Sequence, residues 1–309
     1  MDTGRFTAFA TCWLLLVLLA LHIPSLLDNT ASAEKKKTVL KHADTIEGGQ
    51  TAPASGNPEP FRAAVGNVVF LQDGITLRCN RATEFTEGSR IVLEGSISVN
   101  DGNVEVFGEN GIYFPDDEKG ELSGNTRARM IRDGLVTKAK KAIVDLKANT
   151  LWLHDGAVAW HRGRQLSGDS IMVHVRELDG TKKIDEIRVH GHAFFASADT
   201  LSPDRKLFDQ LSGSTMVIRI DGKSRLTGIT VTSQARSLYH LYEEGRKPSG
   251  VNYSSGDIIR MFFREGKLSS VLVTGNIEGK QYPNRMRGNR AIDLPGFSWK
   301  ENEIPRFGK

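Results

Sequence analysis

The sequence predicts an all-β protein of about fourteen antiparallel strands arranged as repeated hairpin-like units. Three observations support this prediction. Glycine is frequent, with 31 residues, while aromatic residues make up only 7% of the chain, a balance that favours short strands and turns over helices. Apolar and polar residues alternate along most of the chain, which is the period of a strand. Glycine-containing turn sequences separate the alternating runs.

The first 33 residues are predicted to be a signal peptide. Arg5 precedes an apolar run, FATCWLLLVLLAL, and the small residues Ala31, Ser32 and Ala33 form a cleavage site. The apolar run is shorter than the roughly 20 residues that a membrane span needs. We therefore expect export through a cleaved signal, with an uncleaved membrane anchor as the alternative.

The composition of the remaining chain excludes some classes of protein. Cys79 is the one cysteine after the signal, so no internal disulfide can form. The net charge of the whole chain is +4, and aromatic residues are not interleaved with basic ones as nucleic-acid binding requires. A mildly basic exported protein favours an anionic lipid or glycolipid as its partner.

Three segments follow the signal. Residues 34–60 are polar and rich in Gly, Pro, Ala and Ser, which predicts a flexible linker. Residues 61–283 carry the alternating pattern and are expected to form one β-domain. Residues 284–309 are expected to form a C-terminal tail.

A glycine recurs between two alternating apolar runs, on the apolar face of its strand. One interpretation is a strand bend or bulge, which glycine commonly marks. The other is that the missing side chain leaves room within the sheets. The recurring glycines are Gly66, Gly95, Gly124, Gly156, Gly191, Gly228 and Gly275.

The second strand of each unit begins with a small residue and a polar one. Gly168 and Asp169 show this pattern, and Gly256 and Asp257 repeat it, so Asp169 is interpreted as a repeat position and not as a catalytic acid. Hairpin turns are predicted at residues 72–74, 100–103, 132–134 and 161–164. No sustained helix is predicted after the signal, and the insertions at residues 198–210, 237–250 and after 281 are expected to be loops.

The order of these units resembles the OstA-like family, the periplasmic β-jellyroll proteins of lipopolysaccharide transport. The resemblance rests on GNVVFLQDGITLRCNRATEF, LHDGAVAWHRGRQLSGDSIMVHV and GVNYSSGDIIRMFFREGKLSSVLVTGNIEGKQYP, and it covers about residues 62 to 283. It implies an open, twisted antiparallel β-jellyroll whose two facing sheets hold lipid acyl chains. It also implies a periplasmic location and partners that carry similar jellyrolls and join edge to edge, including a head-to-tail homo-oligomer.

Under this resemblance, the inward apolar residues are expected to line a groove for the acyl part of lipopolysaccharide or a related lipid. Apolar binding scales with buried area, at about 0.8 kcal/mol per methylene group. The expected lining residues are Val68, Phe70, Ile97, Val99, Val158, Trp160, Ile187, Val189, Phe195, Val271, Val273 and Ile277.

Catalytic, cofactor and metal sites are not predicted. His190 and His192 have a spacing compatible with a metal, but no cysteine or carboxylate follows at a usual ligand spacing. The sequence DGKS at residues 221–224 lacks the first glycine of a phosphate-binding loop. Two other functions stay open: a structural or interaction β-repeat protein of the cell envelope, and a carbohydrate-binding jelly-roll.

Overall fold

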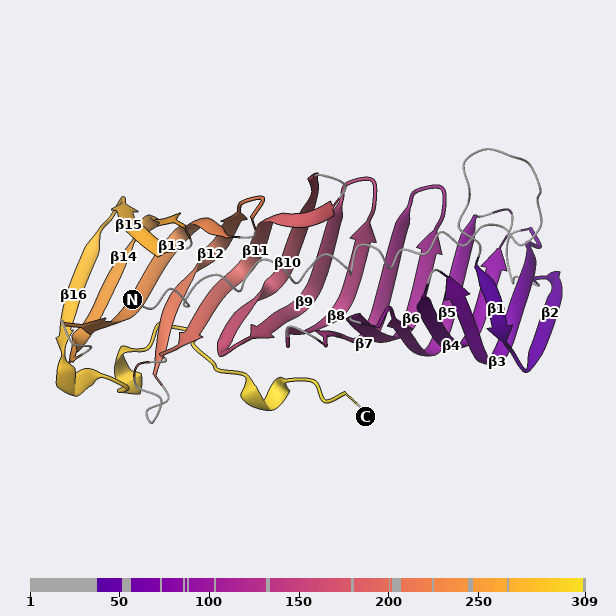
Figure 1. Cartoon of the computed structure of the whole chain (residues 1–309), viewed down its shortest axis with the longest axis horizontal. Helices are drawn as coiled ribbons and strands as arrows, with labels where there is room; N and C mark the ends of the chain where they lie inside the picture. The colour runs from indigo at the N-terminus through magenta and orange to yellow at the C-terminus, as the bar shows by residue number, and fades with distance from the viewer. Residues whose placement is uncertain are drawn as a thin grey trace. The chain divides into compact units, whose positions relative to one another are not determined.

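The computed structural model describes residues 38–307 except 52–56, 73, 86, 88, 103, 132–133, 179–180, 200, 202–206, 224, 244–246 and 266. The predicted signal peptide lies outside the described residues. Sixteen β-strands and three short 3-10 turns form in the described part of the chain (Figure 1). The fold is an open antiparallel β-jellyroll, as the sequence predicts, with two more strands than expected.

The chain divides into two compact units. The N-terminal unit contains the described residues before 135 and residues 138–153, and the C-terminal unit contains residues 135–137 and 154–307. The strands of the N-terminal unit are β1 (Val39–His42), β2 (Thr45–Gln50), β3 (Pro60–Gln72), β4 (Ile75–Phe85), β5 (Arg90–Asn100), β6 (Val104–Phe114), β7 (Lys119–Met130) and most of β8 (Val136–Asp145).

Strand β9 (Thr150–His161) crosses the boundary between the units, and the later strands belong to the C-terminal unit. These strands are β10 (Arg164–Leu178), β11 (Thr181–Ala198), β12 (Phe208–Ile220), β13 (Leu226–Tyr242), β14 (Pro248–Arg264), β15 (Lys267–Thr274) and β16 (Glu278–Pro283). From β3 onward each strand pairs with the next in the sequence, up to β15, while β16 returns to pair with β14. The turns η2 (Asn284–Met286), η3 (Arg290–Ile292) and η4 (Glu301–Glu303) follow.

Alternate strands bend at a corner, by which we mean two consecutive residues with positive φ outside the hairpin turns. The bend interpretation is confirmed for six of the seven predicted glycines, and Gly228 is the exception, because the corner of β13 lies five residues later, at Ser233 and Gln234. The paired register shifts at the corners, as it does between His190 and Ala193. The corners are Gly66/Asn67, Gly95/Ser96, Gly124/Asn125, Asp155/Gly156, Gly191/His192, Ser233/Gln234 and Gly275/Asn276.

The space beside five of the six corner glycines is filled by a polar side chain from another part of the chain, and Gly156 is the exception. A Cβ atom on Gly191 would lie 2.0 Å from Oδ2 of Asp169, and one on Gly275 would lie 2.1 Å from Oδ2 of Asp257. The same packing repeats at Gly95, against Asn80. These glycines therefore do not leave room for a ligand, and the equivalence of Asp169 and Asp257 has a structural reason.

The predicted hairpin turns separate β3 from β4, β5 from β6, β7 from β8 and β9 from β10. The insertion at residues 237–250 differs from the expected loop. Residues 237–242 extend β13, and Leu238, Tyr239 and His240 pair with Tyr253, Asn252 and Val251 of β14. Backbone pairing with β14 continues through residues 237–242, so this part of the insertion forms strand and not loop.

The segment expected to be a flexible linker contains two strands. Strand β1 pairs with β3 through Val39 and Leu71, and β2 pairs with β3 through Ile46 and Ala64. The side chain of Thr38 also donates a 2.5 Å hydrogen bond to Gln72. Backbone hydrogen bonding to the edge of β3 orders these residues despite their polar composition.

The C-terminal tail, residues 284–307, packs along the sheet of the C-terminal unit. Gln210 of β12 donates to Asp293 Oδ1 (2.6 Å) and accepts from the backbone N–H of Leu294 (2.8 Å). Gln165 of β10 accepts from the backbone N–H of Lys300 (2.8 Å). The tail therefore crosses β12 before β10, and Ile292, Leu294, Phe297 and Trp299 join an apolar cluster with Phe194, Ala196, Phe208 and Leu238.

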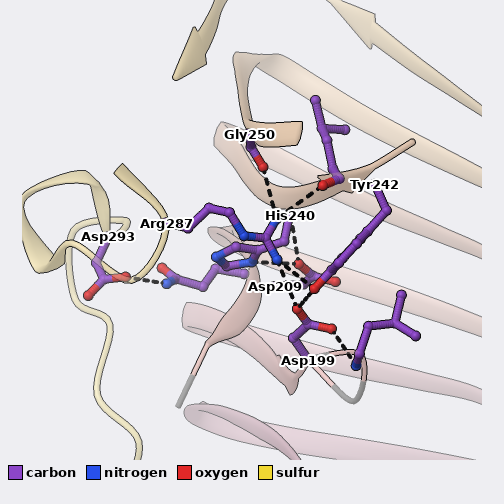
Figure 2. A network of polar contacts seen from close by, with 10 residues as sticks. Asp199, Asp209, His240, Tyr242, Gly250, Arg287 and Asp293 are labelled. Carbon is purple, nitrogen blue, oxygen red and sulfur yellow. Dashed lines mark hydrogen bonds and ion pairs between the residues drawn. The ribbon is translucent and has the colours of Figure 1, made fainter. Parts of the chain in front are cut away.

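A buried ion pair fixes the start of the tail (Figure 2). Arg287 Nη2 lies 3.3 Å from Asp199 Oδ2, with 1% and 4% of the two side chains exposed. Arg287 also donates to the backbone oxygens of Leu241 (3.0 Å) and Gly250 (3.1 Å) and to the hydroxyl of Tyr242 (2.5 Å). The Tyr242 hydroxyl in turn donates to Asp199. The guanidinium thus joins the tail to β13 and β14.

Candidate functional site

The inner face of the C-terminal unit carries two apolar rows that cross six strands. Directly paired residues point to the same side of a sheet, so the register defines each row. On every strand, the residue of one row lies two positions from the residue of the other row, so both rows are on the same face of the sheet. The rows are Ile171, Val189, Met216, Val231, Ile259 and Val273, and Val173, Ile187, Ile218, Ile229, Met261 and Val271.

A small apolar cavity of about 70 Å³ lies inside this unit. Its lining comes from both sides of the corners: Phe195 and Tyr239 follow the corners of β11 and β13, while Ile229 precedes the corner of β13. The two halves of each bent strand therefore face one another across the cavity. The lining residues are Arg164, Phe195, Ser197, Asp209, Ile218, Leu226, Ile229, Tyr239, Met261, Phe263 and Leu268.

The polar atoms at the cavity are few and mostly partnered. The Tyr239 hydroxyl donates to Met261 Sδ at 3.2 Å. Burial raises the pKa of Tyr239, and the negative charge of Asp209 raises it further, so this phenol is neutral at physiological pH. Asp209 accepts a 2.9 Å hydrogen bond from the backbone N–H of His240. The site offers apolar area and no activated nucleophile.

The apolar rows reach the surface at β15. Val271 is 45% exposed and Leu268 is 43% exposed. Among the described strands, β15 pairs with β14 alone, so no further strand covers these side chains. The apolar interior of the C-terminal unit is therefore open at this end.

The inner face of the N-terminal unit is a closed apolar cluster. Val68, Phe70, Ile97 and Val99 pack there with Leu77, Cys79 and the small residues Ala64 and Ala82. Burial raises the pKa of the Cys79 thiol to about 12, although a backbone hydrogen bond from Arg81 lowers it. Cys79 is thus a protonated core residue at neutral pH.

The twelve predicted lining residues fall into three groups. Four lie together in the N-terminal unit: Val68, Phe70, Ile97 and Val99. Five others lie on strands of the C-terminal unit that the apolar rows cross: Ile187, Val189, Phe195, Val271 and Val273. A sixth, Ile277, lies in the connection between β15 and β16. Ile277 is 66% exposed. The reason is that β15 ends at Thr274, before the chain reaches Ile277.

Val158 and Trp160 lie on the other face, which corrects the expected orientation. The Trp160 ring nitrogen donates to Gln165 Oε1 at 3.1 Å, and that oxygen also accepts from the tail at Lys300. Trp160 therefore faces the tail, and Val158, two residues earlier, shares its side. The reason is the place of the glycine in the corner. Gly156 is the second residue of the corner of β9, whereas Gly191 is the first residue of the corner of β11. Side chains at the same distance after the two glycines therefore point to opposite faces.

Sequence reasoning missed Tyr239, Met261 and Phe263 as cavity residues. Tyr239 belongs to the insertion that was expected to be a loop. The two tyrosines of this segment, Tyr239 and Tyr242, were the available indication of a strand, because tyrosine is enriched in strands.

The histidines considered as metal ligands have other partners. His192 Nδ1 lies 3.0 Å from Asp169 Oδ1, with both side chains largely exposed. Within the part of the chain that the structure describes, no group of three or more His, Cys, Asp or Glu side chains could hold a metal ion. No helix among the described residues is long and apolar enough to cross a membrane.

Comparison with known proteins finds a distant structural similarity. No family model matches the chain, and no curated protein does. A solved structure, LptH of Pseudomonas aeruginosa, is the LptA-homologous periplasmic component of the lipopolysaccharide transport device. It is 14% identical, with a TM-score of 0.36, over 49% of this chain and 97% of LptH. A similarity this distant does not assign a function to this chain.

Proposed function

We propose that this protein is a periplasmic lipid-binding protein that carries or bridges lipopolysaccharide, or a related lipid, toward the outer membrane without catalysis. The observation that supports the proposal is the pair of apolar rows that cross six strands, one of which ends at the exposed Val271. Acyl chains are the ligands that match such a surface, because apolar binding is non-directional and proportional to area.

The groove would be lined in the C-terminal unit by Ile187, Val189, Phe195, Val271 and Val273. In the N-terminal unit Val68, Phe70, Ile97 and Val99 would take the same role. The observed cavity of about 70 Å³ is below the volume of an acyl chain, so binding requires the two layers to separate. The β15 edge would be the place where another jellyroll component pairs by strand addition.

Site-specific photo-crosslinking in the native cell tests the proposal. A photoreactive residue at Val189, which is 0% exposed, is expected to label lipid. Arg188 is the matched control, because it is the adjacent residue of β11 and points to the opposite face. A second pair, Ile97 and Ser98, tests the N-terminal unit.

Equal lipid labelling from inward and outward positions would reject the groove. Labelling of protein alone from both positions would favour a structural or interaction protein of the envelope.

A further inference from the structure

The outer face of the C-terminal unit contains a second cleft, of about 670 Å³, with polar and apolar lining residues. It lies between the corners of the strands and the C-terminal tail. One wall is formed by Asp169, His192, Ser214 and Gln234 at or beside the corners, and the other by the tail residues Pro295, Gly296, Ser298 and Lys300. None of the interior apolar rows contributes to it.

The floor of the cleft is a row of paired residues across four strands. Ser167 pairs with Phe194, Phe194 with Ser212, and Ser212 with Arg236. Directly paired residues share a face, so the serine hydroxyls and the Arg236 guanidinium lie on the side that the tail covers.

The tail hydrogen-bonds to the polar side chains of the neighbouring row, whereas on this row it packs against Phe194 and gives Ser212 no hydrogen bond. Gln165 and Gln210, two residues from Ser167 and Ser212, both hydrogen-bond to the tail. Ser212 is 6% exposed, and its Oγ has no hydrogen-bond partner. A buried hydroxyl left unpaired costs free energy, and this one belongs to a residue that lines the cleft.

The charges in the cleft favour an anion. Arg236 and Lys300 supply two positive charges, and within the described residues neither side chain is in an ion pair. The single carboxylate, Asp169, is already beside His192, at 3.0 Å. Guanidinium and ammonium groups with a hydroxyl donor are the groups that bind phosphate oxygens in proteins.

We propose that this cleft binds a phosphate-bearing ligand through Arg236, Lys300 and the hydroxyl of Ser212. The ligand is either a soluble phosphate or the phosphate headgroup of a lipid, since both present the same oxygens. The inference is independent of lipid binding in the interior, because the two sites lie on opposite faces of the strands.

Titration of the full mature chain with inorganic phosphate, followed by amide NMR, tests the proposal. Saturable shifts are expected at Ser212, Arg236 and Lys300. Arg236→Gln should weaken binding by about tenfold, the equivalent of one charge-assisted hydrogen bond, and Arg236→Lys should retain most of it. Arg260→Gln, the same charge change on β14 outside the cleft, is the matched control and should bind phosphate normally.

Ser212→Ala separates a binding role from a structural one. It should weaken phosphate binding by about threefold while raising the melting temperature, because it removes an unsatisfied buried hydroxyl. The same variant also keeps the proposal testable if Arg236→Gln does not fold.

Vesicle co-sedimentation distinguishes the two sources. Binding to phosphatidylcholine vesicles that contain phosphatidic acid, but not to phosphatidylcholine alone, with loss in Arg236→Gln, would identify a lipid headgroup. Phosphate binding without vesicle binding would identify a soluble ligand. Absence of saturable phosphate shifts, or equal weakening by Arg236→Gln and Arg260→Gln, would overturn the proposal.

Discussion

At the scale of single residues, the corners decide which side chains face inward. A corner needs two consecutive residues with positive φ, and glycine adopts this conformation without steric cost. In β11 the glycine comes first, at Gly191, and in β9 it comes second, at Gly156. This difference of one residue places Phe195 in the interior cavity but turns Trp160 toward the tail.

Replacing corner glycines by alanine separates backbone strain from side-chain clash. Gly156 and Gly191 have φ values of +76° and +67°, but only a Cβ on Gly191 would meet other atoms, at Asp169. Gly156→Ala is expected to destabilise by about 1–2 kcal/mol from backbone strain alone. Gly191→Ala should cost at least about 1 kcal/mol more, because Asp169 must move.

Urea unfolding of the two variants measures the difference in the free energy of unfolding. Equal losses of stability would show that the Asp169 side chain does not constrain the corner.

At the scale of elements, the tail and the extended strands β13 and β14 depend on one another. Arg287 brings the tail to the backbone of Leu241 and Gly250, near the ends of these strands. The same guanidinium neutralises the buried carboxylate of Asp199. The tail is thus part of the packed structure of the C-terminal unit.

Removing the guanidinium should release the tail. Arg287→Ala leaves Asp199 buried without its countercharge, which is expected to cost about 3–5 kcal/mol. Hydrogen exchange should then accelerate at the Leu294 amide, which donates to Gln210. Arg285→Ala, at an exposed position in the same turn, is the control and should change stability by less than about 0.5 kcal/mol. Unchanged exchange at Leu294 in Arg287→Ala would show that other contacts hold the tail.

At the scale of the whole molecule, the important feature is an open sheet with exposed apolar side chains at its end strands. In the C-terminal unit Val271 and Leu272 of β15 are 45% and 47% exposed, and in the N-terminal unit Ile46 of β2 is 73% exposed. Uncovered strand edges of this kind pair readily with another chain.

Self-association through β15 is expected to be sensitive to an inward-pointing charge. The unaltered protein is expected to associate with increasing concentration in sedimentation velocity, and Val271→Lys should reduce that association, because inward charges oppose edge pairing. Ile131→Lys removes a side chain of similar exposure, 50%, in the connection between β7 and β8, and should associate as the unaltered protein does. Equal effects of both substitutions would attribute association to general hydrophobicity.

The sequence by itself determined most of the strands from β3 onward, the hairpin turns and the glycine that marks six of the seven corners, because these depend on local alternation and on backbone conformation. It also determined the equivalence of Asp169 and Asp257. Only the tertiary structure decided what depends on contacts between distant segments. Two features of this kind are the pairing of β1 and β2 with β3 and the extension of β13 and β14. Two others are the orientation of the Trp160 side chain and the cleft whose floor contains Ser212 and Arg236. The physical reason is that a period of two specifies which residues share a face, whereas the partner that covers each face is chosen by packing.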